Sequence, residues 1–260
     1  MPTLEIARPR PEIAVITLNR PDKLNALSPE LVEDLHATLD AIAADNDCRV
    51  VVLTGAGRGF CSGLDLTDGS TPAVSAGLEK PRAGMRWQER IAALTVKLHR
   101  LRQPVIAAVN GAAYGGGFAL AMAADIRIAS EAARFCTQFI KLGLGGCDIG
   151  VSYTLPRIIG AGPAFDLILT ARTVEAAEAL RLGMVSRIAT DPLAEALEIA
   201  DTMCGFGTFG LESTKQVLWA NLDAGCLETA LQVENRSQIL AAGSGAMRAF
   251  TEAFAARKQG

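Results

Sequence analysis

Two glycine-rich segments carry backbone N–H groups that suit the binding of an oxygen atom. The first is GAGRGFCSGLDL, residues 55–66, and the second is NGAAYGGGFALAM, residues 110–122; each follows an apolar run that predicts a buried strand. A helix start leaves amides unpaired at the positive end of the helix dipole, and glycine lets a ligand oxygen come close to them. Close packing of a helix is the alternative reason for three consecutive glycines.

Neither segment has the spacing of a nucleotide-binding loop. In GAGRGF, Phe60 stands where the third glycine of the dinucleotide fingerprint belongs, and no Gly-Lys-Ser or Gly-Lys-Thr follows. Two donor segments that both follow buried strands favour a different site, in which two N–H groups converge on one carbonyl oxygen. Such an oxyanion hole stabilises an enolate or a tetrahedral oxyanion formed from a thioester.

Composition excludes several other classes of function. The 260 residues are half apolar, which fits one large domain or one domain with an appendage. Lys plus Arg number 25 and Asp plus Glu number 28, so the net charge of −3 offers no basic field for nucleic acid or an anionic membrane. The chain has no run of apolar residues long enough to cross a membrane and shows no secretion signal, which predicts a cytoplasmic protein.

The cysteines and histidines predict neither a disulfide framework nor a metal centre. Six cysteines without CxxC pairs are expected to be reduced thiols. The two histidines, His36 and His99, lie in helical patterns and are expected to be solvated on helix surfaces. A zinc site or a histidine-based triad is therefore hard to assemble, and we expect no metal.

Periodicity predicts strands and helices that alternate along the chain. The runs 13–18, 50–55 and 104–111 are apolar at nearly every position, as in strands buried on both faces. Ser28, followed by Pro29 and Glu30, predicts a helix start, because serine caps free amides and proline presets φ. The buried stripe of that helix is Leu31, Leu35, Leu39 and Ile42.

A second helical pattern runs through Ile91, Leu94, Leu98 and Leu101 and ends before Pro104. The preceding residues 66–84 are rich in Gly, Pro and Ser and predict a mobile loop of the kind that forms lids. From about residue 191 the strand signals vanish and the chain is predicted to be helical. The alternation of strands and helices indicates an α/β fold with a helical C-terminal subdomain.

Four ordered motifs resemble the crotonase, or enoyl-CoA hydratase/isomerase, superfamily. They are TLNRPDKLNALS (17–28), VVLTGAGRGFCSGLDL (51–66), PVIAAVNGAAYGGGFALAMAADIRIAS (104–130) and ILTARTVEAAEALRLGMVSRI (168–188). The resemblance implies a crotonase-type spiral of ββα units that binds acyl-CoA thioesters and assembles as a homotrimer or a hexamer. It makes residues 1–190 the core with the acyl-CoA site and residues 191–260 a helical subdomain for oligomerisation. Coenzyme A is part of the substrate, so no separate cofactor is expected.

The resemblance also suggests site residues. The family's two oxyanion-hole donors fall on the amides of Leu64 and Gly116 of this sequence. The positions that match its coenzyme A contacts are Arg20, Lys23, Ala26, Ser62 and Leu64. For Arg20 and Lys23 a solvated turn is the alternative interpretation.

The sequence departs from the hydratases of this family at both catalytic glutamates. The two positions hold Ala119 and Phe139, which cannot activate water or move a proton and are expected only to line the substrate. Asp148, in GCDIGVSY, falls near the aspartate of the dienoyl-CoA isomerases and the nucleophilic aspartate of chlorobenzoyl-CoA dehalogenase. The alternative is that Asp148 only caps the helix starting near Val151.

Other side chains are weaker candidates for the site. Asp125 precedes the strand after the GGG helix and is expected to make a structural hydrogen bond, whereas Gln138 is a candidate to line the acyl pocket. The pocket is predicted to be apolar, with lining from Met85, Trp87, Phe118 and Phe139.

Three functions are consistent with these residues. The leading hypothesis is an enzyme that hydrates or isomerises an enoyl-CoA through a thioester enolate, with Asp148 moving the proton. A single acid suits isomerisation better than hydration, which benefits from two groups that orient water. The alternatives are an acyl-CoA-binding protein without chemistry and a hydrolase-like or dehalogenase-like enzyme in which Asp148 attacks carbon.

Overall fold

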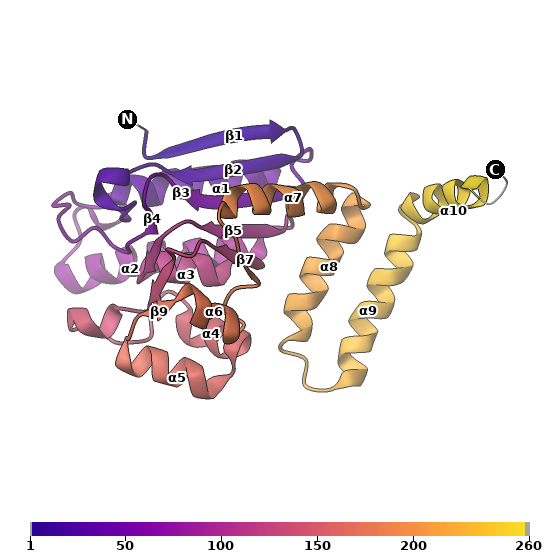
Figure 1. Cartoon of the computed structure of the whole chain (residues 1–260). Helices are drawn as coiled ribbons and strands as arrows, with labels where there is room; N and C mark the ends of the chain where they lie inside the picture. The colour runs from indigo at the N-terminus through magenta and orange to yellow at the C-terminus, as the bar shows by residue number, and fades with distance from the viewer. Residues whose placement is uncertain (1, 258–260) are drawn as a thin grey trace.

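The strands of this protein divide into two sheets. The structure is a computed structural model that describes residues 2–257 (Figure 1). The larger sheet has the order β1 (Leu4–Arg10), β2 (Ile13–Leu18), β3 (Val50–Gly55), β5 (Val105–Val109), β7 (Ile126–Ala129) and β10 (Arg187–Ile188). The smaller sheet has the order β4 (Gly59–Cys61), β6 (Ala112–Tyr114), β8 (Arg134–Cys136) and β9 (Val174–Glu175).

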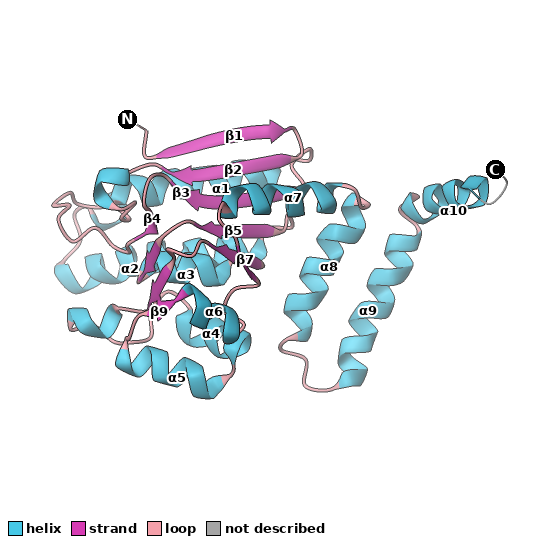
Figure 2. Cartoon of the chain, in the orientation of Figure 1, coloured by secondary structure: helices cyan, strands magenta, loops and turns pink. Residues whose placement is uncertain are grey.

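The chain moves between the two sheets in a repeating unit. Each of β3, β5 and β7 lies in the larger sheet and is followed directly by a short strand, β4, β6 or β8, of the smaller one. A helix comes after the first two strand pairs: α2 (Lys80–Arg100) and α3 (Gly116–Ala123). The β3, β5 and β7 strands pair in parallel (Figure 2). This arrangement is the ββα spiral that the sequence predicted.

The long elements form for the reasons that the sequence suggested. Every residue of β3 and β5 is buried, as continuous apolar runs require. The first helix is α1 (Pro29–Ala44), and Ser28 caps it by accepting a hydrogen bond from Leu31 N at 3.2 Å. All residues of α3 are buried, because this apolar helix lies inside the core against β4 and β6 of the smaller sheet, α2 and α4.

Two predictions about local structure were wrong. The proposed loop 66–84 is shorter, because α2 begins at Lys80 and a short 3₁₀ helix, η2 (Ala73–Ser75), interrupts the rest. His36 is only 1 % exposed, since the buried face of α1 is wide enough to include it, and its Nε2 lies 2.8 Å from the Arg90 carbonyl oxygen of α2. Solvation on a helix surface therefore does not describe His36.

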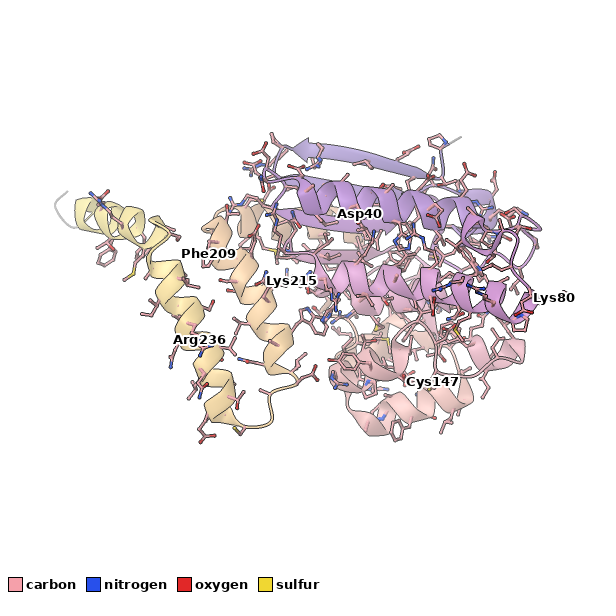
Figure 3. The ribbon with its side chains drawn as sticks, turned by 180° about the vertical axis from the view of Figure 1, so that it is seen from behind. Asp40, Lys80, Cys147, Phe209, Lys215 and Arg236 are labelled. Carbon is pink, nitrogen blue, oxygen red and sulfur yellow. The ribbon has the colours of Figure 1, made fainter. Side chains whose placement is uncertain are left out.

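The second half of the chain is mainly helical. It contains η3 (Phe139–Leu142), α4 (Val151–Ile159), α5 (Ala161–Thr170), α6 (Ala176–Arg181), α7 (Pro192–Cys204), α8 (Thr208–Asn221), α9 (Leu227–Ala242) and α10 (Ala246–Arg257). In Figure 1, α7 lies against the larger sheet, whereas α9 and α10 extend away from the core as an arm. Figure 3 shows Lys215 between α8 and the core and Arg236 out on α9.

The absence of a disulfide framework is confirmed. All six cysteines are free thiols; four are buried, and Cys147 and Cys226 are exposed. Within residues 2–257, none of the helices is both long enough and apolar enough to cross a bilayer.

Candidate active site

The two glycine-rich segments meet in the fold. Gly63 has a φ of +95°, and a Cβ on this residue would lie 3.3 Å from the Gly116 nitrogen. The turn that contains Gly63 is fixed from its other side, because Leu27 and Leu64 form a parallel bridge in which Leu27 N donates to Gly63 O at 2.7 Å. The segment around Leu64 therefore lies directly on the start of α3.

The amides of Leu64 and Gly116 are both free. Among the described residues, neither N–H donates to a protein acceptor. The bridge to Leu27 uses the groups on either side of Leu64, Gly63 O and Asp65 N, and leaves its own N–H unused. Gly116 is the first residue of α3, where no helix carbonyl is within reach. The geometry thus offers two unpaired donors from separate segments at one place.

These donors border a small cavity of about 90 Å³. Its apolar lining comes mostly from leucine side chains of three segments, and of the four predicted pocket residues only Phe139 takes part. The residues that line it are Leu27, Ser62, Gly63, Leu64, Leu66, Gln88, Ile91, Gly115, Gly116, Gln138, Phe139, Leu142, Leu144, Asp148 and Ile149. Leu64, Leu66, Leu142 and Leu144 are also exposed, so the mouth of the cavity is apolar. An apolar chain fits such an entrance.

Asp148 is the one ionisable side chain among these lining residues. It is half-buried, and its Oδ1 accepts hydrogen bonds from Gln88 Nε2 and, at 2.7 Å, from Ile149 N. The helix α4 is capped instead by Gly150, without any side-chain bond. The alternative role of Asp148 as a helix cap is therefore wrong, and its carboxylate faces the cavity.

Two residues of this cavity have a left-handed backbone that side chains rarely adopt. Gln138 has a φ of +55° and Ile149 a φ of +48°. Such conformations cost roughly 1–3 kcal/mol each and are concentrated at functional sites. The carboxamide of Gln138 makes no hydrogen bond to other described residues, which leaves it available to a ligand.

Phe139 and Ala119 hold the positions of the missing glutamates. Phe139 is buried, and its ring lies 3.7 Å from the position of a Cβ on Gly115, so it closes one wall of the cavity. Ala119 is buried inside α3 and is not part of the lining. The cavity as it stands does not reach Ala119.

Arg20 and Ala26, two of the expected coenzyme A contacts, are occupied by bonds within the protein. Arg20 Nη2 pairs with Asp65 Oδ2 at 2.8 Å, and its Nη1 donates to the Ala26 carbonyl oxygen. Burial acts to raise the pKa of Asp65, but hydrogen bonds from Thr67 and Arg20 outweigh it and hold that pKa at about 2. The pair therefore remains ionised at neutral pH and ties the turn after β2 to the first glycine-rich segment.

The other expected contacts lie closer to the surface. Lys23 is exposed, and its Nζ makes one long contact, 3.4 Å, with Thr67 Oγ1. Ser62 lines the cavity, and its hydroxyl lies 3.4 Å from the Lys23 carbonyl oxygen. Ser62 and Lys23 thus sit next to each other beside Leu64.

Asp125 has the structural role that was predicted. Its Oδ2 accepts from Val105 N at 2.6 Å and pairs with Lys215 at 2.9 Å, while its Oδ1 accepts from Trp219 Nε1 at 2.6 Å. These groups line a separate cavity of about 430 Å³ between α8 and the core, which contains none of the predicted site residues. Among the described residues, no group of three His, Cys, Asp or Glu side chains is arranged to hold a metal.

Sequence reasoning missed Gln88. It lies on α2 three residues before the buried Ile91, so the two share a helix face, and that spacing was the available signal. What the sequence could not indicate is that this face is turned toward the loop that carries Asp148.

Comparison with known proteins gives consistent results. The family model for enoyl-CoA hydratase/isomerase matches residues 9–256. A probable enoyl-CoA hydratase, EchA12 of Mycobacterium bovis, is 45 % identical over 256 residues, which cover 98 % of this chain and 89 % of that protein. The crystal structure of a probable enoyl-CoA hydratase/isomerase from Mycobacterium abscessus is 43 % identical, with a TM-score of 0.89 and coverage of 100 % of this chain and 96 % of that one. A monofunctional enoyl-CoA isomerase from M. smegmatis is 41 % identical, with a TM-score of 0.74 and coverage of 89 % and 99 %.

Proposed function

Because the chain belongs to the enoyl-CoA hydratase/isomerase family of enzymes, we propose that it moves the double bond of an enoyl-CoA through a thioester enolate. The observation that carries this proposal is the single carboxylate, Asp148, in one cavity with the free amides of Leu64 and Gly116. One carboxylate is enough for a reaction in which a proton is removed and returned.

The reaction balances with these groups alone. The Asp148 carboxylate removes a proton from Cα of a 3-enoyl-CoA, and the electrons of that bond move onto the thioester oxygen. The N–H groups of Leu64 and Gly116 stabilise the resulting oxyanion; loss of one such donor typically costs roughly 10²–10³ in rate. The protonated Asp148 then returns the proton to Cγ, which leaves a 2-enoyl-CoA and the original carboxylate.

Hydration is the second candidate, and one observation favours it. The carboxamides of Gln88 and Gln138 line the cavity together with Asp148, and hydrogen-bonding groups of this kind orient a water molecule. In this reaction Asp148 removes a proton from the water that attacks Cβ, and the protonated Asp148 then delivers that proton to Cα of the enolate, which leaves a 3-hydroxyacyl-CoA and the original carboxylate. The M. bovis relative is also named a probable enoyl-CoA hydratase.

The proposal extends to substrate binding and assembly. Lys23 and Ser62, at the surface beside Leu64, are proposed to contact the coenzyme A moiety, with Arg20 and Ala26 shaping the turn that presents them. Residues 1–190 carry the acyl-CoA site, and residues 191–260 join a homotrimer or a hexamer. We propose a cytoplasmic location, which agrees with six free thiols.

The test compares wild type with Asp148→Asn on 3-enoyl-CoA and crotonyl-CoA, followed by absorbance and product mass. We expect wild type to convert 3-enoyl-CoA and the variant to lose roughly 10²–10⁴ in kcat, because the proton-transferring group is gone. The matched control is Asp47→Asn, which changes an exposed surface aspartate and should retain the wild-type rate. Unchanged turnover in Asp148→Asn would remove this carboxylate from the mechanism.

The alternatives predict other outcomes of the same experiment. A protein that binds acyl-CoA but converts none of these esters is a binding protein. If Asp148 attacks carbon, a single turnover in ¹⁸O-labelled water places the label first in the protein.

A further inference from the structure

The two oxygens of Asp148 have different surroundings. Oδ1 accepts two hydrogen bonds, one from Gln88 Nε2 and one from Ile149 N at 2.7 Å. Within the described residues, Oδ2 accepts none. The carboxylate is therefore held by one oxygen while the other is left for a ligand.

The bond from Ile149 comes from a residue with an unusual backbone. A φ of +48° is rare for a β-branched residue, and it sets the direction in which the chain continues from the Ile149 amide toward Gly150 and α4. The Ile149 side chain is 9 % exposed and packs beside Gly116, with its Cδ1 3.5 Å from the position of a Cβ there. Packing in the cavity therefore supports the strained turn.

The bond from Gln88 comes from a different element. Gln88 projects from α2, which Ile91, Leu94 and Leu98 anchor in the core. Asp148 lies 60 residues later, in the loop before α4. The carboxamide of Gln88 thus joins a firmly packed helix to the loop that carries the carboxylate.

We propose that Gln88 is the positioning residue for Asp148 and that Oδ2 is the oxygen that exchanges protons with the substrate. This inference rests on the proposed function, since it assigns the geometry of the same proton transfer. Gln88 itself touches no reacting atom and acts through Asp148.

A neutral carboxamide suits this role in both halves of the reaction. When Oδ2 takes the substrate proton, Oδ1 remains a carbonyl oxygen and still accepts from Gln88 and Ile149. Asp148 therefore keeps its orientation between removal and return of the proton. A carboxylate in place of Gln88 donates to Oδ1 only while it holds a proton, so its support depends on pH.

The experiment uses Gln88→Leu, Gln88→Glu and the control Glu89→Gln in the full-length protein. Leucine keeps a similar volume without the donor, and Glu89 is the next residue of α2, pairing with Arg86 on the surface away from the cavity. Steady-state kcat and KM are measured from low to high pH with the enoyl-CoA that the wild type converts fastest. Melting temperatures establish that each variant is folded.

For Gln88→Leu we expect kcat to fall about tenfold or more with KM within about twofold, since the charge-assisted bond positions the base and does not bind coenzyme A. For Gln88→Glu we expect the rate to be closest to wild type at low pH, where the two carboxyl groups share a proton. As pH rises and that proton is lost, the two carboxylates should repel each other. We therefore expect kcat of Gln88→Glu to fall with rising pH over a range in which kcat of wild type does not fall. Glu89→Gln should match wild type throughout.

The outcomes separate this inference from the proposed function. If wild type converts an enoyl-CoA and Asp148→Asn does not, but both Gln88 variants keep the wild-type kcat and pH profile, the positioning role is wrong and the proposed function stands. If wild type converts no enoyl-CoA, the proposed function fails and the role of Gln88 fails with it. A fall in kcat for Gln88→Leu, together with a fall in kcat at high pH for Gln88→Glu, supports the positioning role and the proposed function.

Discussion

At the scale of single residues, the three glycines at the start of α3 differ in what their lack of a side chain allows. Gly115 has a φ of +50°, and Gly116 presents a free amide to the cavity. Gly117 has a packing reason, because a Cβ there would lie 2.1 Å from the Cys61 carbonyl oxygen and 2.7 Å from its carbonyl carbon. Ligand approach and close helix packing were alternative explanations; the structure shows close packing at Gly117 and leaves the Gly116 amide unpaired, as the proposed contact with a ligand oxygen requires.

Gly117→Ala should therefore disturb fold and site together. The backbone of β4 or α3 must shift, which we expect to lower the free energy of unfolding by about 1–3 kcal/mol or more. Because that shift moves Gly116 N, kcat should fall as well. Urea unfolding and steady-state kinetics measure the two effects. The matched control is Gly69→Ala, where no atom lies within 4 Å of the new Cβ; a loss at Gly69 equal to that at Gly117 contradicts the packing argument.

The burial of His36 predicts that the stability of the fold depends on pH. Burial lowers its pKa from 6.5, with smaller contributions from the charges of Arg90 and Lys97, while the Arg90 carbonyl and Glu33 act in the other direction. The unfolded chain then binds a proton at a higher pH than the folded one does. Stability from neutral His36 is complete above pH 6.5 and is lost as pH falls toward the folded pKa.

We expect the free energy of unfolding to decrease below pH 6.5, by at most about 1.4 kcal/mol per pH unit for this one proton. His36→Gln keeps a donor for the Arg90 carbonyl without titrating, so it should reduce the slope. His99, whose pKa burial also lowers, remains in the variant and retains part of the effect. Identical slopes for wild type and His36→Gln would contradict the assignment.

At the scale of elements, one buried ion pair fixes α8 to the core. Lys215 Nζ donates to the carbonyl oxygens of Leu98 and Gln103 at 3.1 and 3.0 Å and pairs with Asp125, and its side chain is 4 % exposed. Burial lowers the pKa of Lys215, and Asp125 partly offsets this. The ion pair and the Trp219 bond therefore determine where the arm leaves the core.

Lys215→Met should be strongly destabilising, because it removes the cation that pairs with the mostly buried side chain of Asp125. We expect the free energy of unfolding to fall by about 3–5 kcal/mol and the amides of α8 to exchange hydrogen faster. Adding Asp125→Asn should recover part of that loss, since the uncompensated charge is removed. Lys80→Met, at the exposed start of α2, is the matched control. If the decrease in the free energy of unfolding of the double variant equals the sum of the decreases of the two single variants, the pairing of Lys215 with Asp125 is contradicted.

At the scale of the whole molecule, the arm formed by α9 and α10 carries many exposed apolar side chains and has little of the described chain to pack against. No residue of α9 is buried, and the fully described side chains of the arm include exposed apolar ones. They are Leu227, Leu231, Val233, Ile239, Leu240, Met247, Phe250 and Phe254. Exposed apolar side chains in such numbers are typical of protein interfaces, and the arm projects from the core (Figure 1), so it is the surface that we propose for contacts between copies of the chain.

Ile239→Asp should therefore dissociate the assembly. Ile239 is 76 % exposed in the single chain, and a carboxylate at a covered position would be buried without a partner. We expect wild type to sediment as a trimer or a hexamer and the variant as smaller species at the same concentration. The matched control is Ile6→Asp on β1, 53 % exposed and away from the arm, which should not change the sedimentation. A monomeric wild type would contradict the prediction.

The sequence alone determined the elements whose signal is local. A strand such as 50–55 is apolar at nearly every position because both its faces are buried, and the start of α1 is encoded by Ser28 and Pro29. The three-residue strands β4, β6 and β8 were not predicted, because they are too short for a periodic pattern and form by pairing within the smaller sheet. The family also came from the sequence, since ordered motifs keep their spacing, and the resemblance supplied Leu64 and Gly116 as the proposed donor positions.

Only the tertiary structure decided which side chains share the site. Asp148 had a catalytic and a capping interpretation, and the direction of its side chain excluded the second. Gln88 was not identified, because its bond to Asp148 joins segments 60 residues apart and no local pattern encodes such a contact. Arg20, expected at coenzyme A, is paired with Asp65 instead. Motif spacing specifies backbone positions, whereas side-chain partners depend on how separate elements pack.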